Sequence, residues 1–86
     1  MPRTSGSYFY VYTMAYATVA AKERIERTPD AVANPGEIVA QAKMADSEYK
    51  AGMAFFRACR AARRNPLAFQ VLVERGQEVI IDVRMP

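Results

Sequence analysis

The chain has 86 residues, of which 51% are hydrophobic and 24% charged, and its formal net charge is +3. This composition is typical of one small globular domain and excludes a disordered chain. Without histidine and with one cysteine, a zinc site and a disulfide framework are excluded. The mild positive charge permits a nucleic-acid or acidic-protein partner but does not require one.

The N-terminal region combines a polar segment with a run of aromatic residues. Residues 1–7 are mostly polar and include Pro2 and Gly6, which predicts a short flexible arm. Residues 8–13 are all aromatic or β-branched, a pattern that predicts a strand with three tyrosines on one face. The alternative is one continuous helix over residues 7–27, because so short a run does not decide between the two periods.

A first helix is predicted over residues 14–28. Its apolar side chains recur at helical spacing, and Glu23 and Arg27 form an i,i+4 pair in the favourable order. Thr28 followed by Pro29 closes the helix, because a residue before proline avoids helical geometry. The apolar face comprises Met14, Ala17, Thr18, Ala21 and Ile25.

The next element is predicted to be one long helix over residues 35–64. Asn34 supplies a capping oxygen, Pro35 suits the first helical position, and Glu37 stands where a capping box places an acid. Arginines in the last turn suit the negative end of the helix dipole, and Pro66 prevents continuation. A helix of this length would dominate so small a domain.

The long helix is expected to have an apolar and a basic face. The small residues among the apolar positions predict close packing against a partner helix, and Cys59 is expected to be a buried, reduced thiol. The apolar face comprises Ile38, Ala42, Ala45, Tyr49, Gly52, Phe56 and Cys59. The basic row comprises Lys43, Lys50, Arg57, Arg60 and Arg64. Its acid-free end is a candidate partner-binding site comprising Arg57, Arg60, Arg63 and Arg64.

Residues 68–74 and 78–84 are predicted to form a β-hairpin. Both segments alternate in polarity, and Arg75–Gln77 separates them with a glycine at its centre. A three-residue loop is favoured because it sets Val73 opposite Val79 and keeps apolar side chains together on one face.

Together these elements predict one α+β domain spanning residues 1–86, in the order β-α-α-β-β. A lone hairpin is only marginally stable, so residues 8–13 are expected to complete a three-stranded antiparallel sheet, with a helical hairpin on one face. The other face would then be a second candidate partner-binding surface. It comprises Tyr8, Tyr10, Tyr12, Leu72 and Ile80.

Enzymatic activity is not expected, and no catalytic, cofactor-binding or metal-binding residue is predicted. No histidine is present to act as a general base or to activate Cys59. The glycines are scattered, so no phosphate-binding loop is formed. The longest apolar stretch, residues 8–21, is too short to span a bilayer, and no signal peptide is recognisable. The protein is therefore expected in the cytoplasm, away from membranes.

These features predict a small, non-enzymatic interaction protein that binds and blocks or modulates a larger macromolecular assembly. Compact domains without motifs are frequent among phage and mobile-element proteins that inhibit host defence systems, anti-CRISPR proteins included. The expected partner is a protein or a multi-subunit complex, and self-association into a homo-oligomer is also considered. The alternatives are a basic nucleic-acid-binding regulatory module and a structural subunit of an oligomer or virion.

Overall fold

The structure, a computed structural model, describes residues 8–85, which contain four strands and two helices. In chain order these are β1 (Phe9–Tyr16), α1 (Val19–Arg27), β2 (Ile38–Ala45), α2 (Glu48–Arg63), β3 (Ala68–Arg75) and β4 (Glu78–Arg84). The α+β class is confirmed, but the three-stranded sheet and the dominating long helix are wrong. The predicted arm at residues 1–7 lies outside the described range.

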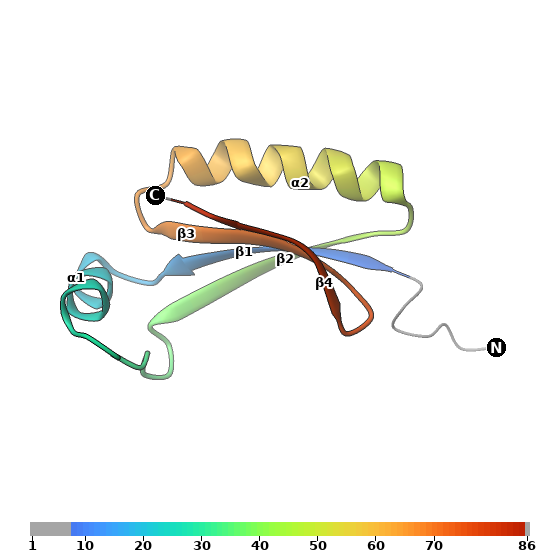
Figure 1. Cartoon of the computed structure of the whole chain (residues 1–86). Helices are drawn as coiled ribbons and strands as arrows, with labels where there is room; N and C mark the ends of the chain where they lie inside the picture. Colours follow the sequence, from blue (N-terminus) through green and yellow to red (C-terminus); the bar gives the residue numbers. More distant parts are fainter. Residues whose placement is uncertain (1–7, 86) are drawn as a thin grey trace.

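The strands form one antiparallel sheet in the order β2–β1–β3–β4. Because β1 is antiparallel to both of its neighbours, β2 and β3 run in the same direction, and α2 crosses over β1 to connect them. In place of the predicted helical hairpin, α2 alone lies along one face of the sheet, and α1 lies beyond the end of β1 (Figure 1).

The predicted long helix is wrong because its apparent start is a turn that leads into β2. The Glu37 N–H donates to the Asn34 carbonyl oxygen at 3.0 Å, and Gly36 has a φ of 84°. Proline followed by a glycine with positive φ is the pattern of a type II turn, so Pro35 serves the turn and not a first helical position. After this turn, Ile38–Ala45 pairs with β1 along its whole length.

β1 extends further than predicted, and α1 begins later. Residues 14–16 continue β1, since both β2 and β3 offer backbone partners there. The helix starts only after Thr18, whose hydroxyl oxygen accepts a hydrogen bond from the Ala21 N–H at 3.0 Å. This side-chain cap fixes the boundary between strand and helix. The predicted end at Thr28 is confirmed, and the alternative of one helix over residues 7–27 is wrong.

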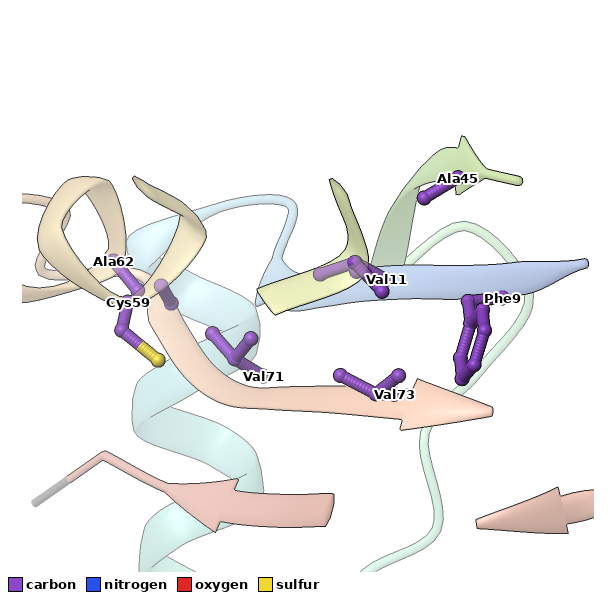
Figure 2. Close-up of a cluster of buried hydrophobic side chains, with 9 residues drawn as sticks. Phe9, Val11, Ala45, Cys59, Ala62, Val71 and Val73 are labelled. Carbon is purple, nitrogen blue, oxygen red and sulfur yellow. The ribbon is translucent and has the colours of Figure 1, made fainter. Parts of the chain in front are cut away.

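α2 starts at its own cap, and its small residues pack against the sheet instead of a second helix. The Ser47 hydroxyl oxygen accepts from the Lys50 N–H at 3.2 Å, and the helix ends at Arg63 with Arg64 as its C-cap, within one residue of the predicted end. Figure 2 shows the cluster beneath α2, in which Cys59 lies near Val71. The cluster comprises Phe9, Val11, Ala45, Ala51, Cys59, Ala62, Ala68, Val71 and Val73.

Cys59 is buried, as predicted. Burial raises the pKa of the Cys59 thiol, and the positive charge of Arg63 opposes that rise only partly. The thiol is therefore protonated near neutral pH and behaves as a small apolar core residue.

The β3–β4 hairpin lies where the sequence places it, but its register differs. Arg75 pairs with Glu78, which leaves a two-residue loop in which Gly76 has a φ of 65°. Val73 pairs with Ile81 and not with Val79, because a β-bulge shifts the register between Val73 and Glu74. The bulge keeps apolar residues opposed while allowing the tighter turn.

Two glycines of the chain have opposite backbone requirements, which predicts opposite effects of alanine. Gly52 lies within α2 and has open space where the methyl group of an alanine would lie, so Gly52→Ala should stabilise the protein by about 0.5–1 kcal/mol. Gly36→Ala should destabilise it by about 1–2 kcal/mol, because its φ is positive. Thermal unfolding monitored by circular dichroism measures both effects. A lower Tm for Gly52→Ala than for wild type would contradict this account of α2.

Arg24 of α1 connects this helix to the turn at residues 34–37 through an ion pair and hydrogen bonds. Its guanidinium forms an ion pair with the Glu37 carboxylate and donates to the Val32 carbonyl oxygen at 3.2 Å. Glu37 Oε1 also accepts from the Asn34 N–H at 2.6 Å. The hydrogen bond from Arg24, followed by that from Asn34, lowers the pKa of Glu37 below its ordinary value of 4.5.

Replacement of Glu37 with glutamine is expected to lower the Tm at neutral pH and to have little effect in acid. Because the folded-state pKa is depressed, the ionised carboxylate stabilises the fold above its unfolded pKa, and this stabilisation is lost as the pH falls through the folded-state pKa. The Tm difference from wild type should therefore close below pH 4.5. Glu26→Gln, on the exposed side of α1, is the control. A Tm difference independent of pH would refute the linkage.

Candidate interaction surface on helix α2

α2 exposes a line of large side chains along its solvent side, and two of them also border a cavity between α2 and β2. Tyr49, Met53, Phe56 and Arg60 follow one another at steps of four, three and four residues, so they share one face of the helix. We call these four residues the α2 stripe. Their apolar members are 77%, 40% and 58% exposed for Tyr49, Met53 and Phe56, respectively. Individual exposed apolar residues are common on protein surfaces, but an aligned group of this size indicates an interaction surface.

The opposite face of α2 explains why these large side chains are exposed. Ala51, Cys59 and Ala62 are buried against the sheet, and Ala58 packs beside them. Small residues allow the helix to lie close to the strands, and they leave the bulky residues on the solvent side. The prediction that Tyr49 and Phe56 belong to the buried face is therefore wrong.

Arginines continue the stripe towards the C-terminal end of α2. The Arg60 guanidinium lies 5.8 Å from the centre of the Phe56 ring, within range of a cation–π interaction. Arg57, Arg63 and Arg64 are also exposed, and none of these four arginines forms an ion pair with another described residue. The structure thus places the predicted arginines on the C-terminal half of α2 and at its C-cap, and it places Arg60 beside an aromatic ring that was predicted to lie in the core.

The cations predicted to precede them along the helix are distributed over two elements. Lys43 lies on β2, whereas Lys50 lies in the first turns of α2 and pairs with Asp46 at 3.1 Å. Lys43, Lys50 and Arg57 nevertheless line one cavity between β2 and α2. Their seven-residue spacing reflects no common helix, because the chain turns between Lys43 and Lys50.

The second candidate surface is present in part, on the sheet face opposite α2. Tyr12 pairs with Leu72, and Tyr10 lies two residues before Tyr12, so all three share that face. The rings of Tyr10 and Tyr12 are stacked with their centres 6.2 Å apart. Tyr8 instead lines the cavity between β2 and α2, and Ile80 lies at the β4 bulge on the outer strand. These tyrosines and Leu72 are only half-exposed, in contrast to the α2 stripe.

The exposure of Tyr49 and Phe56 was not predicted, although one local pattern in the sequence indicates which residues share the opposite side of the helix. Ser47 followed by a helical segment is a capping pattern, and a helix that begins there has Ala51, Ala58 and Ala62 on one side. The sequence does not show that this side of small residues is the buried one, since the side with the aromatic residues is more hydrophobic.

Residues 8–85 were also compared with the requirements of other kinds of site. No group of three or more His, Cys, Asp or Glu side chains there is placed to hold a metal ion. Neither described helix combines the length and hydrophobicity needed to cross a membrane.

The fold and surface define a small α+β domain in which one helix covers one face of a four-stranded antiparallel sheet. Comparison with family models, curated proteins and solved structures gave no match to this chain.

Proposed function

We propose that this protein is a non-enzymatic interaction protein that binds a protein partner, within a larger macromolecular assembly, through the α2 stripe. The observation that carries the proposal is the exposure of Tyr49, Met53 and Phe56 beside Arg60. Aromatic residues, methionine and arginine are enriched where protein partners bury each other's surfaces, and tyrosine and arginine often dominate the binding energy. The adjoining arginines, Arg57, Arg63 and Arg64, would then meet an acidic rim on the partner.

The finer proposal is that binding blocks or modulates the assembly, as an inhibitor of a host defence system carried by a phage or mobile element, in the manner of anti-CRISPR proteins. A domain of 86 residues is large enough to cover a site on its target, because a standard interface buries only about 800 Å² of each partner. A helix with one protruding apolar line suits this role, because such a helix can enter a groove of the target with anchors at i, i+4 and i+7.

The proposal is tested by affinity capture from the native host, followed by mass spectrometry. Wild type and the double variant Tyr49→Ser/Phe56→Ser are compared. A matched control replaces two exposed valines elsewhere, Val19→Ser/Val32→Ser, because these residues are also largely exposed. Wild type and control should recover the same partner, and the stripe variant should not. Recovery of no partner by wild type, or equal recovery by the stripe variant, would refute the proposal.

A nucleic-acid-binding regulatory module is the second candidate function. It is supported by the four arginines at the end of α2, which have no carboxylate partner among the described residues. Binding of this kind weakens steeply with salt, because each neutralised phosphate releases counterions. Absence of binding to DNA and RNA at low salt, or binding that Arg57→Glu/Arg60→Glu leaves unchanged, would dismiss this candidate.

A further inference from the structure

β2 is an edge strand whose outer backbone groups can be assigned. The Ala17 N–H donates to the Glu37 carbonyl oxygen at 2.8 Å, in the register that continues from Tyr16 paired with Ile38. Bonded and non-bonded pairs alternate in an antiparallel ladder, so the odd-numbered residues of β2 bond to β1. The even-numbered residues therefore direct their N–H and C=O groups away from the sheet. They are Ile38, Ala40, Ala42 and Met44.

A groove runs beside this edge, between β2 and α2. It consists of two cavities of about 590 and 520 Å³, which share Lys43, Ala54 and Arg57 and are therefore consecutive parts of one channel. The groove exists because α2 packs mainly over β1 and β3 and leaves residues 39–43 of β2 exposed, whereas Ala45 is buried in the core. On the helix side its wall includes Ala58 and Ala61, whose small side chains leave room for those of a ligand.

The groove is positively charged. Lys43 pairs with Val11 across the ladder, so its side chain lies on the α2 side of β2, and Arg57 lines the same space from the helix. Neither forms an ion pair with a described residue. The acidic residue in the lining, Asp46, is already paired with Lys50 at 3.1 Å. A lysine and an arginine without an ion-pair partner among residues 8–85, in an open groove, favour an acidic ligand.

We propose that the groove binds an extended acidic segment of a protein partner, which adds to β2 as an antiparallel fifth strand. The outer edge of β2, which pairs with no other described strand, supplies backbone hydrogen bonds, and the groove receives every second side chain of the segment. Acidic side chains at those alternate positions would meet Lys43 and Arg57, and the intervening ones would lie beside Ala40 and Ala42. A peptide fits better than a nucleic acid, because only a peptide matches the donors and acceptors of the β2 edge.

This site meets the α2 stripe at Tyr49 and Met53, which also line the larger of its two cavities. It rests on the proposed function only in that the partner is a protein. The two are tested separately. Capture of the partner depends on Tyr49 and Phe56, whereas the peptide experiment below needs no identified partner and leaves those residues unchanged. Failure of either experiment does not decide the other.

The probe is a capped peptide of about eight residues that alternates valine and glutamate, titrated into the isotopically labelled full chain and followed by NMR of the backbone amides. The amides of residues 38–44 should shift most. A peptide of the same composition with its glutamates in adjacent pairs should bind at least about tenfold more weakly, because its acids do not share one face. Equal binding of both peptides, or shifts elsewhere on the protein, would overturn the proposal.

Three variants distinguish the contribution of backbone pairing at the β2 edge from the contribution of the groove's positive charge. Ala42→Pro removes one outward N–H without touching the β1 ladder and should weaken binding about tenfold, whereas Ala42→Thr keeps the N–H and should bind like wild type. Lys43→Glu/Arg57→Glu should weaken binding by about tenfold or more. Binding unchanged in both the proline and the charge variants refutes the site. Selective perturbation of the groove amides by single-stranded oligothymidylate, with none by the peptide, also refutes it and assigns the groove to nucleic acid.

Discussion

Replacement of Val71 with aspartate is expected to leave the protein unfolded at room temperature. Val71 is 0% exposed and lies in β3 between Thr13 of β1 and Val83 of β4, beneath α2. A carboxylate there would have no cation among the residues of the core cluster, and burying an unpaired charge costs several kcal/mol. A domain of 86 residues has about 4–13 kcal/mol of stability in total, so one such change removes most of it.

Circular dichroism during heating measures this effect. Val71→Asp should show no cooperative transition, whereas Val71→Ala, which only removes buried methyl groups, should cost about 2–3 kcal/mol and still fold. Val32→Asp provides the matched control, because Val32 is exposed and the same chemical change there should cost less than about 1 kcal/mol. A cooperative transition for Val71→Asp near the wild-type Tm would contradict the described core.

The parts of the fold that could be predicted are those in which local chemistry and tertiary packing agree. The β3–β4 segments alternate in polarity and surround a glycine, and both strands form there. The end of α2 combines last-turn arginines with Asn65 and Pro66, and the helix ends at Arg63 with Arg64 as its C-cap. In each case neighbouring residues alone determine the element, and packing against the rest of the chain does not change it.

β2 could not be predicted because its sequence does not favour a strand. Four of the eight residues of Ile38–Ala45 are alanine or glutamine, and lysine and methionine add to this helix-favouring composition. The segment becomes a strand because β1 offers it a full antiparallel partner, and pairing outweighs intrinsic preference. The turn at residues 34–37 added to the error, since proline after asparagine suits both a helix start and a type II turn.

The candidate site was predicted only in part, because the exposure of its aromatic residues depends on how α2 packs against the sheet. The exposure of Arg57 and Arg60 follows from their charge, whereas Tyr49 and Phe56 could be placed only once the buried side of α2 was known. Phe55 and Phe56 illustrate the difficulty: they are adjacent and identical, yet Phe55 packs against the core and Phe56 is 58% exposed. Helical periodicity assigns neighbouring residues to different directions but does not say which direction is inward.

This pair gives the sharpest test of the α2 stripe once a partner has been captured. Phe56→Ala should weaken partner binding by about 2 kcal/mol or more, a loss of about thirtyfold in affinity, and should change the Tm little. Phe55→Ala should do the reverse, lowering the free energy of unfolding by about 2–3 kcal/mol while the folded fraction binds normally.

Arg60→Ala is expected to have an intermediate effect on binding. It removes the positively charged guanidinium, which lies 5.8 Å from the Phe56 ring. The loss of partner affinity should therefore be smaller at high salt, because salt screens the charge, but some loss should remain because the contact with the ring is also removed. Calorimetric titration at two salt concentrations, combined with thermal unfolding of each variant, measures all three changes. If Phe56→Ala destabilises the fold as much as Phe55→Ala, or leaves partner affinity intact, then the exposed ring is not a binding anchor. If instead Phe55→Ala mainly lowers the Tm and Phe56→Ala mainly lowers partner affinity, then Phe55 stabilises the fold and Phe56 binds the partner.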